Sequence, residues 1–405
     1  MSDVTQILTA CQSGDTAVRT QAEKTLQQAR TSNLPQFYVA MSGELCNDSK
    51  PKNTRQLAGV ILKNCLDANN DQLAEQRAKE WLALPAQIRN QVKGSVVKGL
   101  GSSVQEARDT CAQVVAKIAR IECPKKMWPQ LIPGLQQQIM KSNNASLMQS
   151  STHAIGMCCE EVDPSAFTQD DLNKILTAIV FAMTRKDSET AVRGCKALFL
   201  ALEFIENNMK NKKERDVIMT NICNATNNND ARVRKMAFEC MWRVAEIYYE
   251  FLGSYMQTLF KITLRCVSQD QPLVALQAFE FWLTICEVEA GIVEDAAEGK
   301  GNLNKSANYA RGALKHLLPL IFTTLVKQDE DQDEDTWNIA KAGGVGLKLL
   351  TYAVGPECCQ PVLHFITQKI RSQNWRDREA AYVVVFFLFF YHSLTHTQSQ
   401  KKTDT

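Results

Sequence analysis

The sequence predicts an all-α solenoid, a long array of stacked antiparallel helix pairs. Apolar residues recur three and four positions apart, as in Val114, Ile118 and Ile121, which is the spacing of one face of an α-helix. Of 405 residues only 18 are Gly and 11 are Pro, and they fall between the periodic segments, where they interrupt helices. Alternating strand patterns are scarce. We therefore expect many helices of one to two dozen residues with short polar connections.

A short phrase recurs at regular intervals at the predicted helix starts. It consists of a small polar residue, Val-Arg and an apolar stripe, as at 190–193 and 230–234. Val192, Val233 and Val274 follow one another at equal intervals. A period of about 40 residues with two helices in each is typical of HEAT repeats, which stack because one pair buries too little apolar surface alone. We predict a right-handed HEAT α-solenoid of about nine repeats.

The period is interrupted once. Asn338 and Arg376 are later equivalents of the repeated position and are separated by nearly one period, but the step from Val274 to Asn338 is much longer. An insertion is therefore predicted around Ala296 to Ser306, where Glu-Gly-Lys-Gly-Asn breaks the helical pattern. The Asp and Arg side chains at the starts of the second helices are predicted to pair between adjacent repeats as a ladder.

Composition excludes several classes of protein. The 46 Lys and Arg residues nearly balance the 44 Asp and Glu residues, so no basic field is available to hold nucleic acid. The first residues lack the cationic and apolar segments of a secretory signal. The 14 scattered cysteines indicate reduced thiols in an intracellular chain.

Catalytic and cofactor motifs are not found. Cys158-Cys159 and Cys358-Cys359 are adjacent pairs rather than Cys-X-X-Cys, so we expect no metal site. Five histidines form no catalytic constellation, and we predict no enzyme activity and no cofactor. The stretch 343–348 (Gly-Gly-Val-Gly-Leu-Lys) lacks the spacing of a phosphate loop, and close helix packing explains its glycines better.

The end of the chain differs from the rest. Residues 380–391 are nearly all apolar, but this run is shorter than the ~18–20 residues that span a bilayer, so no membrane insertion is expected. We interpret it as a truncated last repeat whose second helix is replaced by an unrelated sequence. Such an uncovered apolar run is an aggregation hazard.

Six phrases stand in register along the chain: Arg55–Asn64, Trp81-Leu82 with Val92-Lys93, Trp128–Pro133, Ala275–Trp282, Lys327–Asn338 and Asn374–Ala381. Together they resemble the importin-β family of nuclear transport receptors. Within the family, this chain resembles the amino-terminal half, because the resemblance runs from about residue 5 to 382 and stops after Ala381. The family is also strongly acidic, whereas this chain carries a net charge of +2.

The resemblance implies a nuclear import receptor in the cytoplasm, the nucleus and the nuclear pore. Such a receptor binds Ran-GTP and FG-repeat nucleoporins, and it carries cargo directly or through importin-α. Importin-α binding is expected to be weak or absent here, because most of the family's surface for it would lie beyond this chain. The alternative is a HEAT scaffold that organises another complex. The acidic loop with Trp337 and Asn338 favours the receptor, because a scaffold has no need of it.

The resemblance also divides the chain into functional regions. Residues 1–165 are expected to bind Ran, 166–265 to carry nucleoporin pockets, 266–382 to carry the acidic loop, and 383–405 to form a divergent tail. Arg55, Lys63 and Asn64 represent the Ran-facing helix. Arg55 and Lys63 are eight residues apart, a spacing that places them on one helix face. Without the resemblance, this face could equally be an ordinary surface in contact with solvent.

The nucleoporin pockets are expected between the first helices Leu172–Met183 and Glu214–Asn224. A shallow apolar slot there would bury one phenylalanine ring, which contributes ~1.5–3 kcal/mol. The family usually has Phe where this chain has Val217. Without the resemblance these positions could be ordinary packing between repeats. The lining residues are Leu176, Thr177, Val180, Glu214, Val217 and Ile218, with Tyr255 and Ile262 in the neighbouring pocket.

Residues 329–335 contain six carboxylates in seven positions. Composition alone favours a solvated loop. By resemblance it is the family's acidic loop, with Asp329, Glu330 and Asp331 facing Ran and the other acidic residues facing the basic segment of importin-α. Trp337 would stack on a cation and Asn338 would bond the extended backbone of this segment, although Trp337 alone could equally pack in the core. The residues assigned to importin-α are Asp333, Glu334, Asp335, Trp337 and Asn338.

Overall fold

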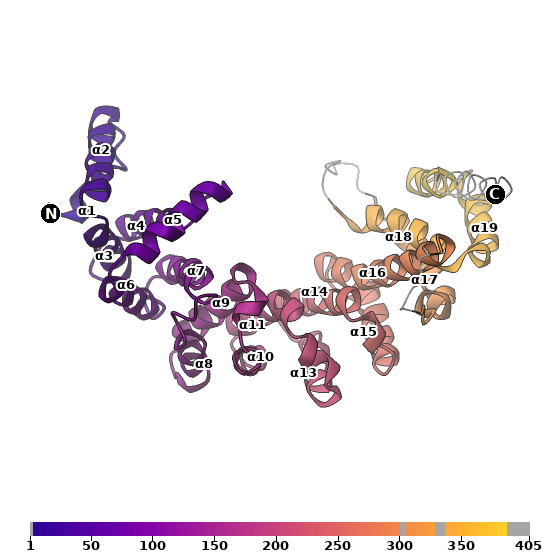
Figure 1. Ribbon diagram of the computed structural model, residues 1–405. Helices are drawn as coiled ribbons and strands as arrows, with labels where there is room; N and C mark the ends of the chain where they lie inside the picture. Colours follow the sequence, from indigo (N-terminus) through magenta and orange to yellow (C-terminus); the bar gives the residue numbers. More distant parts are fainter. Residues whose placement is uncertain (1–2, 300–304, 329–336, 387–405) are drawn as a thin grey trace. The chain divides into compact units, whose positions relative to one another are not determined.

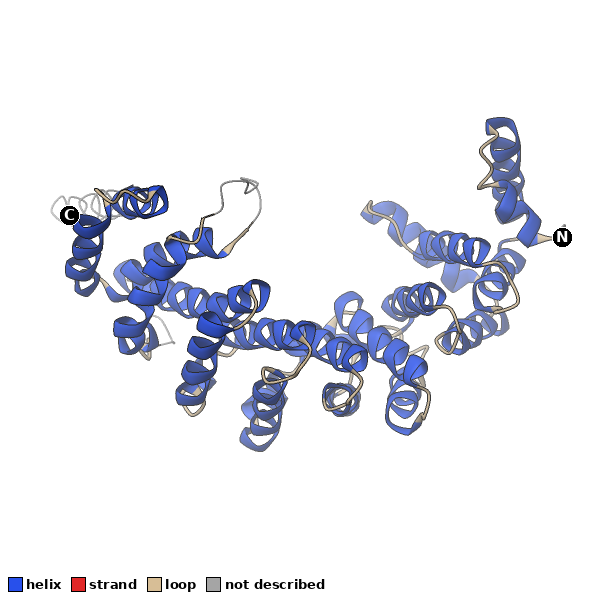
Figure 2. Ribbon diagram, turned by 180° about the vertical axis from the view of Figure 1, so that it is seen from behind, coloured by secondary structure: helices blue, strands red, loops and turns tan. Residues whose placement is uncertain are grey.

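The computed structural model describes residues 3–299, 305–328 and 337–386. Every regular element in these ranges is helical, as Figure 2 shows, and the all-α prediction is confirmed there. The chain divides into two compact units, Met1–Asn208 and Met209–Thr405. The boundary falls inside the predicted region 166–265, whose functional limits stay a prediction.

The first unit is built from consecutive helix pairs (Figure 1). The second helices α4, α7, α9 and α11 also pack against one another in sequence order. Helix α5 is an additional element between two pairs, which the period does not predict. The elements are α1 Val4–Ala10, α2 Thr16–Ser32, α3 Leu34–Cys46, α4 Lys52–Leu66, α5 Asp71–Ala83, α6 Ala86–Gly99, α7 Gln105–Glu122, α8 Leu131–Lys141, α9 Ala145–Glu161, η1 Pro164–Ala166, α10 Gln169–Met183, α11 Ser188–Ala201 and η2 Leu202–Phe204; α12 Glu206–Lys210 crosses the boundary.

The second unit repeats this arrangement, with α14, α16 and α18 packing in order. Helix α16 ends at Ala297 and α17 begins at Tyr309, so the helical pattern breaks where the insertion was predicted. Residues 375–386 are helical and follow α19. The elements are α13 Lys212–Ala225, α14 Ala231–Ile247, η3 Tyr249–Phe251, α15 Met256–Gln269, α16 Pro272–Ala297, α17 Tyr309–Leu325, α18 Ile339–Val354, η4 Pro356–Cys358 and α19 Cys359–Lys369.

An aspartate at or just before the repeated phrase begins three of the second helices as an N-cap. Asp15 accepts hydrogen bonds from the backbone of α2, Asp187 from that of α11, and Asp230 from that of α14. These carboxylates satisfy N–H groups that the first helical turn leaves without partners, and each cap contributes about 1 kcal/mol. Where the phrase stands in α2, α11 and α14 it therefore marks the helix start, whereas α4, α7 and α16 begin without a side-chain cap.

The glycines of 343–348 lie inside α18, where they allow close helix packing. A Cβ added at Gly343 would lie 2.4 Å from the Thr324 hydroxyl of α17, and one at Gly346 would lie 2.7 Å from Leu283 of α16. Both glycines are buried. Their role is to let α18 approach its neighbours, as the sequence analysis predicts.

Asp–Arg ion pairs join repeats in both units, but the two found here do not form the predicted ladder of adjacent repeats. In the first, Arg193 of α11 pairs with Asp109 of α7 at 2.7 Å. In the second, Arg234 of α14 binds both carboxylate oxygens of Asp270, at 2.8 and 2.6 Å. The Arg234–Asp270 contact is bidentate and fixes the register between adjacent repeats. The Arg193–Asp109 pair is a single contact that passes over α9 to the repeat before it.

The Arg193–Asp109 pair acts on a histidine of α9, the helix that packs against both α7 and α11. Burial and then the positive charge of Arg193 lower the pKa of His153 to about 4. Lys196 also lowers this pKa, whereas the carboxylates of Asp109 and Glu189 raise it. Between about pH 6.5 and pH 4, protons therefore bind the unfolded chain in preference to the folded one. This favours unfolding as the pH falls.

We expect a His153→Gln variant to lose less stability on acidification than the parent chain. The difference between pH 6.5 and pH 4 should be about 1–3 kcal/mol, because the histidine charge is disfavoured only in the folded unit. Urea unfolding at several pH values measures this difference. Parallel pH profiles for the two chains would contradict the assignment.

Candidate partner-binding groove

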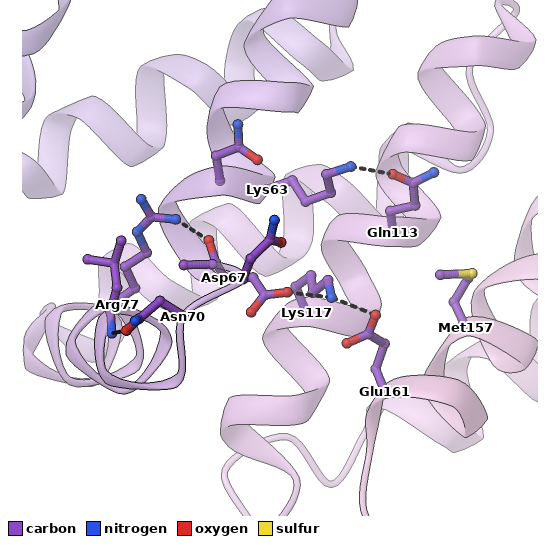
Figure 3. Close-up of a pocket in the computed structure, with 12 residues that line it drawn as sticks. Lys63, Asp67, Asn70, Arg77, Gln113, Lys117, Met157 and Glu161 are labelled. Atoms are coloured by element: carbon purple, nitrogen blue, oxygen red, sulfur yellow. Dashed lines mark hydrogen bonds and ion pairs between the residues drawn. The ribbon is translucent and has the colours of Figure 1, made fainter.

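A groove of about 760 Å³ lies in the first unit at the carboxyl ends of successive second helices. Helices α4, α7 and α9 contribute to it, and α5 with the segment before it forms the opposite wall (Figure 3). Its lining is mainly polar and charged. The lining residues are Lys63, Asn64, Asp67, Ala68, Asn69, Asn70, Leu73, Arg77, Gln113, Lys117, Met157 and Glu161.

The groove contains a row of charges of alternating sign. The Lys117 ammonium lies 2.6 Å from a carboxylate oxygen of Asp67 and 2.6 Å from one of Glu161, so it joins α4, α7 and α9. Arg120 also donates to Asp67, at 2.5 Å. Arg77 of α5 donates to the Asp67 backbone carbonyl. One row of side chains therefore holds three repeats and α5 in fixed positions.

The pKa values of this row show that its charges stabilise one another. Burial alone would raise the pKa of Asp67, but hydrogen bonds from Lys117 and Arg120 outweigh it and lower this pKa. Burial alone would lower the pKa of Lys117, but Asp67 and Glu161 raise it. Both groups are therefore charged at neutral pH, and the groove presents fixed charges to a partner.

Lys63 and Asn64 both line this groove, as their predicted position on one surface requires. Lys63 donates to the Gln113 side-chain oxygen at 3.2 Å, and Asn64 is exposed. A lysine held only by a neutral amide can exchange this contact for a carboxylate or carbonyl of a partner protein.

The placement of Arg55 on the binding face was wrong. Its side chain is only 1% exposed and points into the unit. It donates to the Leu45 carbonyl at 2.9 Å and to the Ser102 hydroxyl at 2.7 Å, and it pairs with Asp48 at 2.8 Å. An arginine with this many internal partners joins loops of adjacent repeats and is not available to another protein.

The predicted nucleoporin residues of the first unit lie on α10. Leu176 is 7% exposed and belongs to the core, whereas Thr177 is exposed and Val180 is half-buried. The predicted helix Leu172–Met183 is confirmed, because it forms part of α10. Of the three predicted residues on it, Thr177 and Val180 are accessible to a partner.

The corresponding residues of the second unit lie on α13. Ile218 is 3% exposed and packs in the core, while Val217 is 52% exposed and Glu214 is exposed. The pocket itself stays a prediction, because its two walls belong to units that are described separately.

Tyr255 and Ile262, assigned to one neighbouring pocket, have different surroundings. The Tyr255 hydroxyl donates to Asp216 at 2.5 Å, which holds the ring against α13. Ile262 lines a small, largely polar pocket of about 270 Å³ with Arg234 and Arg265, and Tyr255 is not part of its lining. Tyr255 is the N-cap of α15 and Ile262 lies about two turns into this helix, and the apolar pocket assigned to them stays a prediction.

Trp337 and Asn338 begin the segment after the acidic loop. Trp337 is 46% exposed, and its indole N–H donates to Glu280 of α16 at 2.5 Å. Asn338 caps α18 by accepting from the backbone of Ala340 and Lys341. The alternative of core packing does not hold for Trp337. The acidic residues Asp329, Glu330, Asp331, Asp333, Glu334 and Asp335 lie outside the described residues.

Sequence reasoning missed the charges that organise the groove. Asp67 follows the last residue of α4, Lys117 lies in the last two turns of α7, and Glu161 is the last residue of α9. Opposite charges near the ends of successive second helices were the available signal. It also missed Glu280, whose pKa is raised by burial although the Trp337 hydrogen bond opposes this.

The described residues also bear on metal binding and on membrane insertion. No group of three or more His, Cys, Asp or Glu side chains among them is placed to hold a metal ion. None of the described helices has the length and apolar character that crossing a membrane requires.

Two protein-family models match the chain. Residues 22–102 match the importin-beta N-terminal domain, and residues 103–262 match a model described as IPO5-like, TPR repeats. The chain is 43% identical to importin subunit beta-1 of Arabidopsis thaliana over 94% of its own length and 44% of that protein. It therefore spans less than half the length of this curated relative.

Solved structures agree with these matches. Yeast importin-beta (Kap95p) superposes with a TM-score of 0.89 at 30% identity, over 97% of this chain and 48% of that one. A structure of Kap95p with RanGDP gives 0.87 at 30% identity, over 97% and 48%. The Kap95:Nup1 complex gives 0.85 at 31% identity, over 95% and 46%. Together the sequence and structural matches show that this chain, an α-solenoid with an importin-β N-terminal domain, belongs to the importin-β family.

Proposed function

We propose that the chain acts as a nuclear import receptor, or as the part of one that binds Ran-GTP and FG nucleoporins. The observation that carries this proposal is 43% identity to an importin subunit beta-1 over 94% of the chain. A binding role, without catalysis, agrees with a groove whose charged side chains form ion pairs with one another. Movement between cytoplasm and nucleus through the nuclear pore follows from this role.

The groove at the ends of α4, α7 and α9 is the proposed Ran surface. It contains Lys63 and Asn64, which the family resemblance assigns to Ran. Its fixed charges are preorganised, which lowers the entropy that binding costs. The relative Kap95p has been solved with RanGDP, which supports a Ran site in this family.

A nucleotide-dependent binding assay tests the proposal. The 405-residue chain is immobilised and titrated with Ran-GTP, Ran-GDP and a phenylalanine-glycine peptide. We expect Ran-GTP to bind more tightly than Ran-GDP, and the peptide to bind weakly and reversibly. A chain that binds neither Ran form nor the peptide would contradict the proposed function.

Weak nucleoporin binding is proposed for the exposed residues of α10 and α13. The relative Kap95 has been solved in a complex with Nup1, which supports such a surface. Val217 offers the sharpest test, because its side chain is exposed and the family usually carries Phe there.

We expect Val217→Asp to weaken binding of the phenylalanine-glycine peptide by about three- to thirty-fold. A carboxylate next to the site of a buried ring removes apolar contact and adds a desolvation cost. Fluorescence anisotropy of a labelled peptide measures the change. Val18→Asp is the matched control, because Val18 is a valine of similar exposure, 45%, on α2. Equal weakening by both variants would contradict the assignment.

The acidic segment is proposed to attract the basic importin-β-binding segment of importin-α. Trp337 would then exchange its Glu280 contact for a stacked cation. Two partners that share part of one surface exclude each other, so Ran-GTP would release this segment by mass action.

Replacing Glu330, Asp331, Asp333 and Asp335 by Ser should weaken binding of a basic importin-α peptide. We expect a loss of about ten-fold or more at low salt and a shallower salt dependence, because fewer charges steer the encounter. Nucleoporin peptide binding should stay the same. Unchanged binding of the basic peptide would exclude this role of the segment.

A further inference from the structure

Two cysteine sulfurs of the first unit are in contact where three helices meet. Cys46 is the last residue of α3 and Cys111 lies in the first half of α7, and their Sγ atoms are 3.8 Å apart. The third helix, α6, ends at this point in Gly99. A Cβ added at Gly99 would lie 2.5 Å from the Cys111 sulfur and 2.8 Å from the Cys46 sulfur. The glycine therefore leaves the space in which the two sulfurs meet.

We propose that Cys46 and Cys111 form an intramolecular disulfide when the protein meets a peroxide. A disulfide bond is about 2.05 Å long, so the two sulfurs must approach by roughly 1.8 Å. Cys46 is the last residue of α3, where rotation of its side chain can shorten this distance. Both residues are thiols in the structure.

The two cysteines differ in their exposure to solvent, so they are expected to act in different steps of disulfide formation. Cys46 is partly exposed, whereas Cys111 is fully buried. The Cys46 thiolate attacks one oxygen of hydrogen peroxide, the O–O bond breaks, and a sulfenic acid and one water form once a proton is taken up. The Cys111 sulfur then attacks the Cys46 sulfur, the S–O bond breaks, and the hydroxyl leaves as water with the Cys111 proton. Overall two thiols and one peroxide give one disulfide and two waters.

The second step is expected to be slower at low pH. The hydrogen bond with Cys46 and then burial raise the pKa of Cys111 well above its usual value, which keeps it protonated. Arg55 lowers and Asp48 raises this pKa, so these nearby charges oppose each other. Because the thiolate is the attacking form, disulfide formation should accelerate as the pH rises.

The bond would join two repeats. It links residues 65 positions apart, and α7 also carries Gln113 and Lys117 of the groove. Closing so long a loop restricts the unfolded chain, so the oxidised first unit should be harder to unfold.

The full 405-residue chain is treated with hydrogen peroxide, the remaining thiols are alkylated, and the peptides are identified by mass spectrometry. We expect a peptide pair joined through Cys46 and Cys111, lighter than the reduced pair by the mass of two hydrogen atoms. Dithiothreitol should reverse the link and lower the midpoint of thermal unfolding to its original value.

Two variants accompany the parent chain. Cys46→Ser should lose the linked peptide completely. Cys11→Ser, which removes another partly exposed cysteine, should keep it. Accumulation of sulfinic acid at Cys46 without a link would overturn the proposal. So would links to other cysteines, or alkylation of both residues in full after peroxide. These readings use the parent chain and do not depend on Ran or nucleoporin binding.

Discussion

Replacing Glu122 by Ala is expected to destabilise the first unit by about 3–5 kcal/mol, because it leaves two buried cations without their counter-charge. The Glu122 side chain is fully buried at the end of α7. Its carboxylate accepts from Arg89 at 2.9 Å, from Lys93 at 2.6 Å and from the Trp81 indole at 3.1 Å. The two cations are themselves 10% and 8% exposed, so water cannot replace the lost partner.

Hydrogen–deuterium exchange of peptides from α6, α7 and α8 measures this effect locally. A local probe is needed because a chain of two compact units need not unfold in one step. Glu122→Gln keeps the shape and removes the charge, so it should cost less than Glu122→Ala. The double variant Glu122→Gln with Lys93→Met should recover part of the loss, since one unpaired cation is removed with it.

Glu75→Ala is the matched control on the surface. Glu75 pairs with Lys79 on exposed α5, with both side chains more than two-thirds exposed, and its loss should leave exchange unchanged. If Glu122→Ala behaved like this control, the buried cluster would not hold the repeats together.

The sequence predicts the helical array well because its signals are local and repeated. Asp187 and Asp230 cap the second helices where the repeated phrase stands, and the break near Ala296 follows from lost periodicity. Helix α5 was missed because a single helix between two pairs has no counterpart in the neighbouring repeats. Local signals therefore predict the elements, and an irregular insertion needs the structure.

Burial of charged residues was the part that spacing could not predict. Arg55 and Lys63 share a spacing typical of one helix face, yet Arg55 is buried and Lys63 lines the groove. The difference comes from Ser102, 47 residues from Arg55 in sequence, which only the folded repeats bring close. Similarly, Lys117 meets Asp67 and Glu161 because three repeats stack. Such contacts depend on the rotation between repeats, which no single helix encodes.

Reversing the charge of Lys63 is expected to weaken Ran-GTP binding by about ten-fold or more, because an interface lysine that faces a carboxylate or carbonyl would become repulsive. The variant Lys63→Glu suits this test, since Lys63 donates to the neutral Gln113 side chain and its loss should leave the unit folded. Lys117 is less suitable. It bridges two carboxylates, so its reversal would also disrupt the packing of α4, α7 and α9.

Surface plasmon resonance at two salt concentrations separates the effect of the charge on the association rate from its effect on the bound complex. We expect Lys63→Glu to lower the association rate and to alter its salt dependence, because the changed charge acts on encounter as well as on the bound state. Lys79→Glu is the control, an equal charge reversal on exposed α5 outside the groove. Equal losses in the two variants would indicate a general effect of net charge, and no loss in Lys63→Glu would place the Ran surface elsewhere. A parent chain that does not bind Ran-GTP would instead contradict the Ran-binding part of the proposed function.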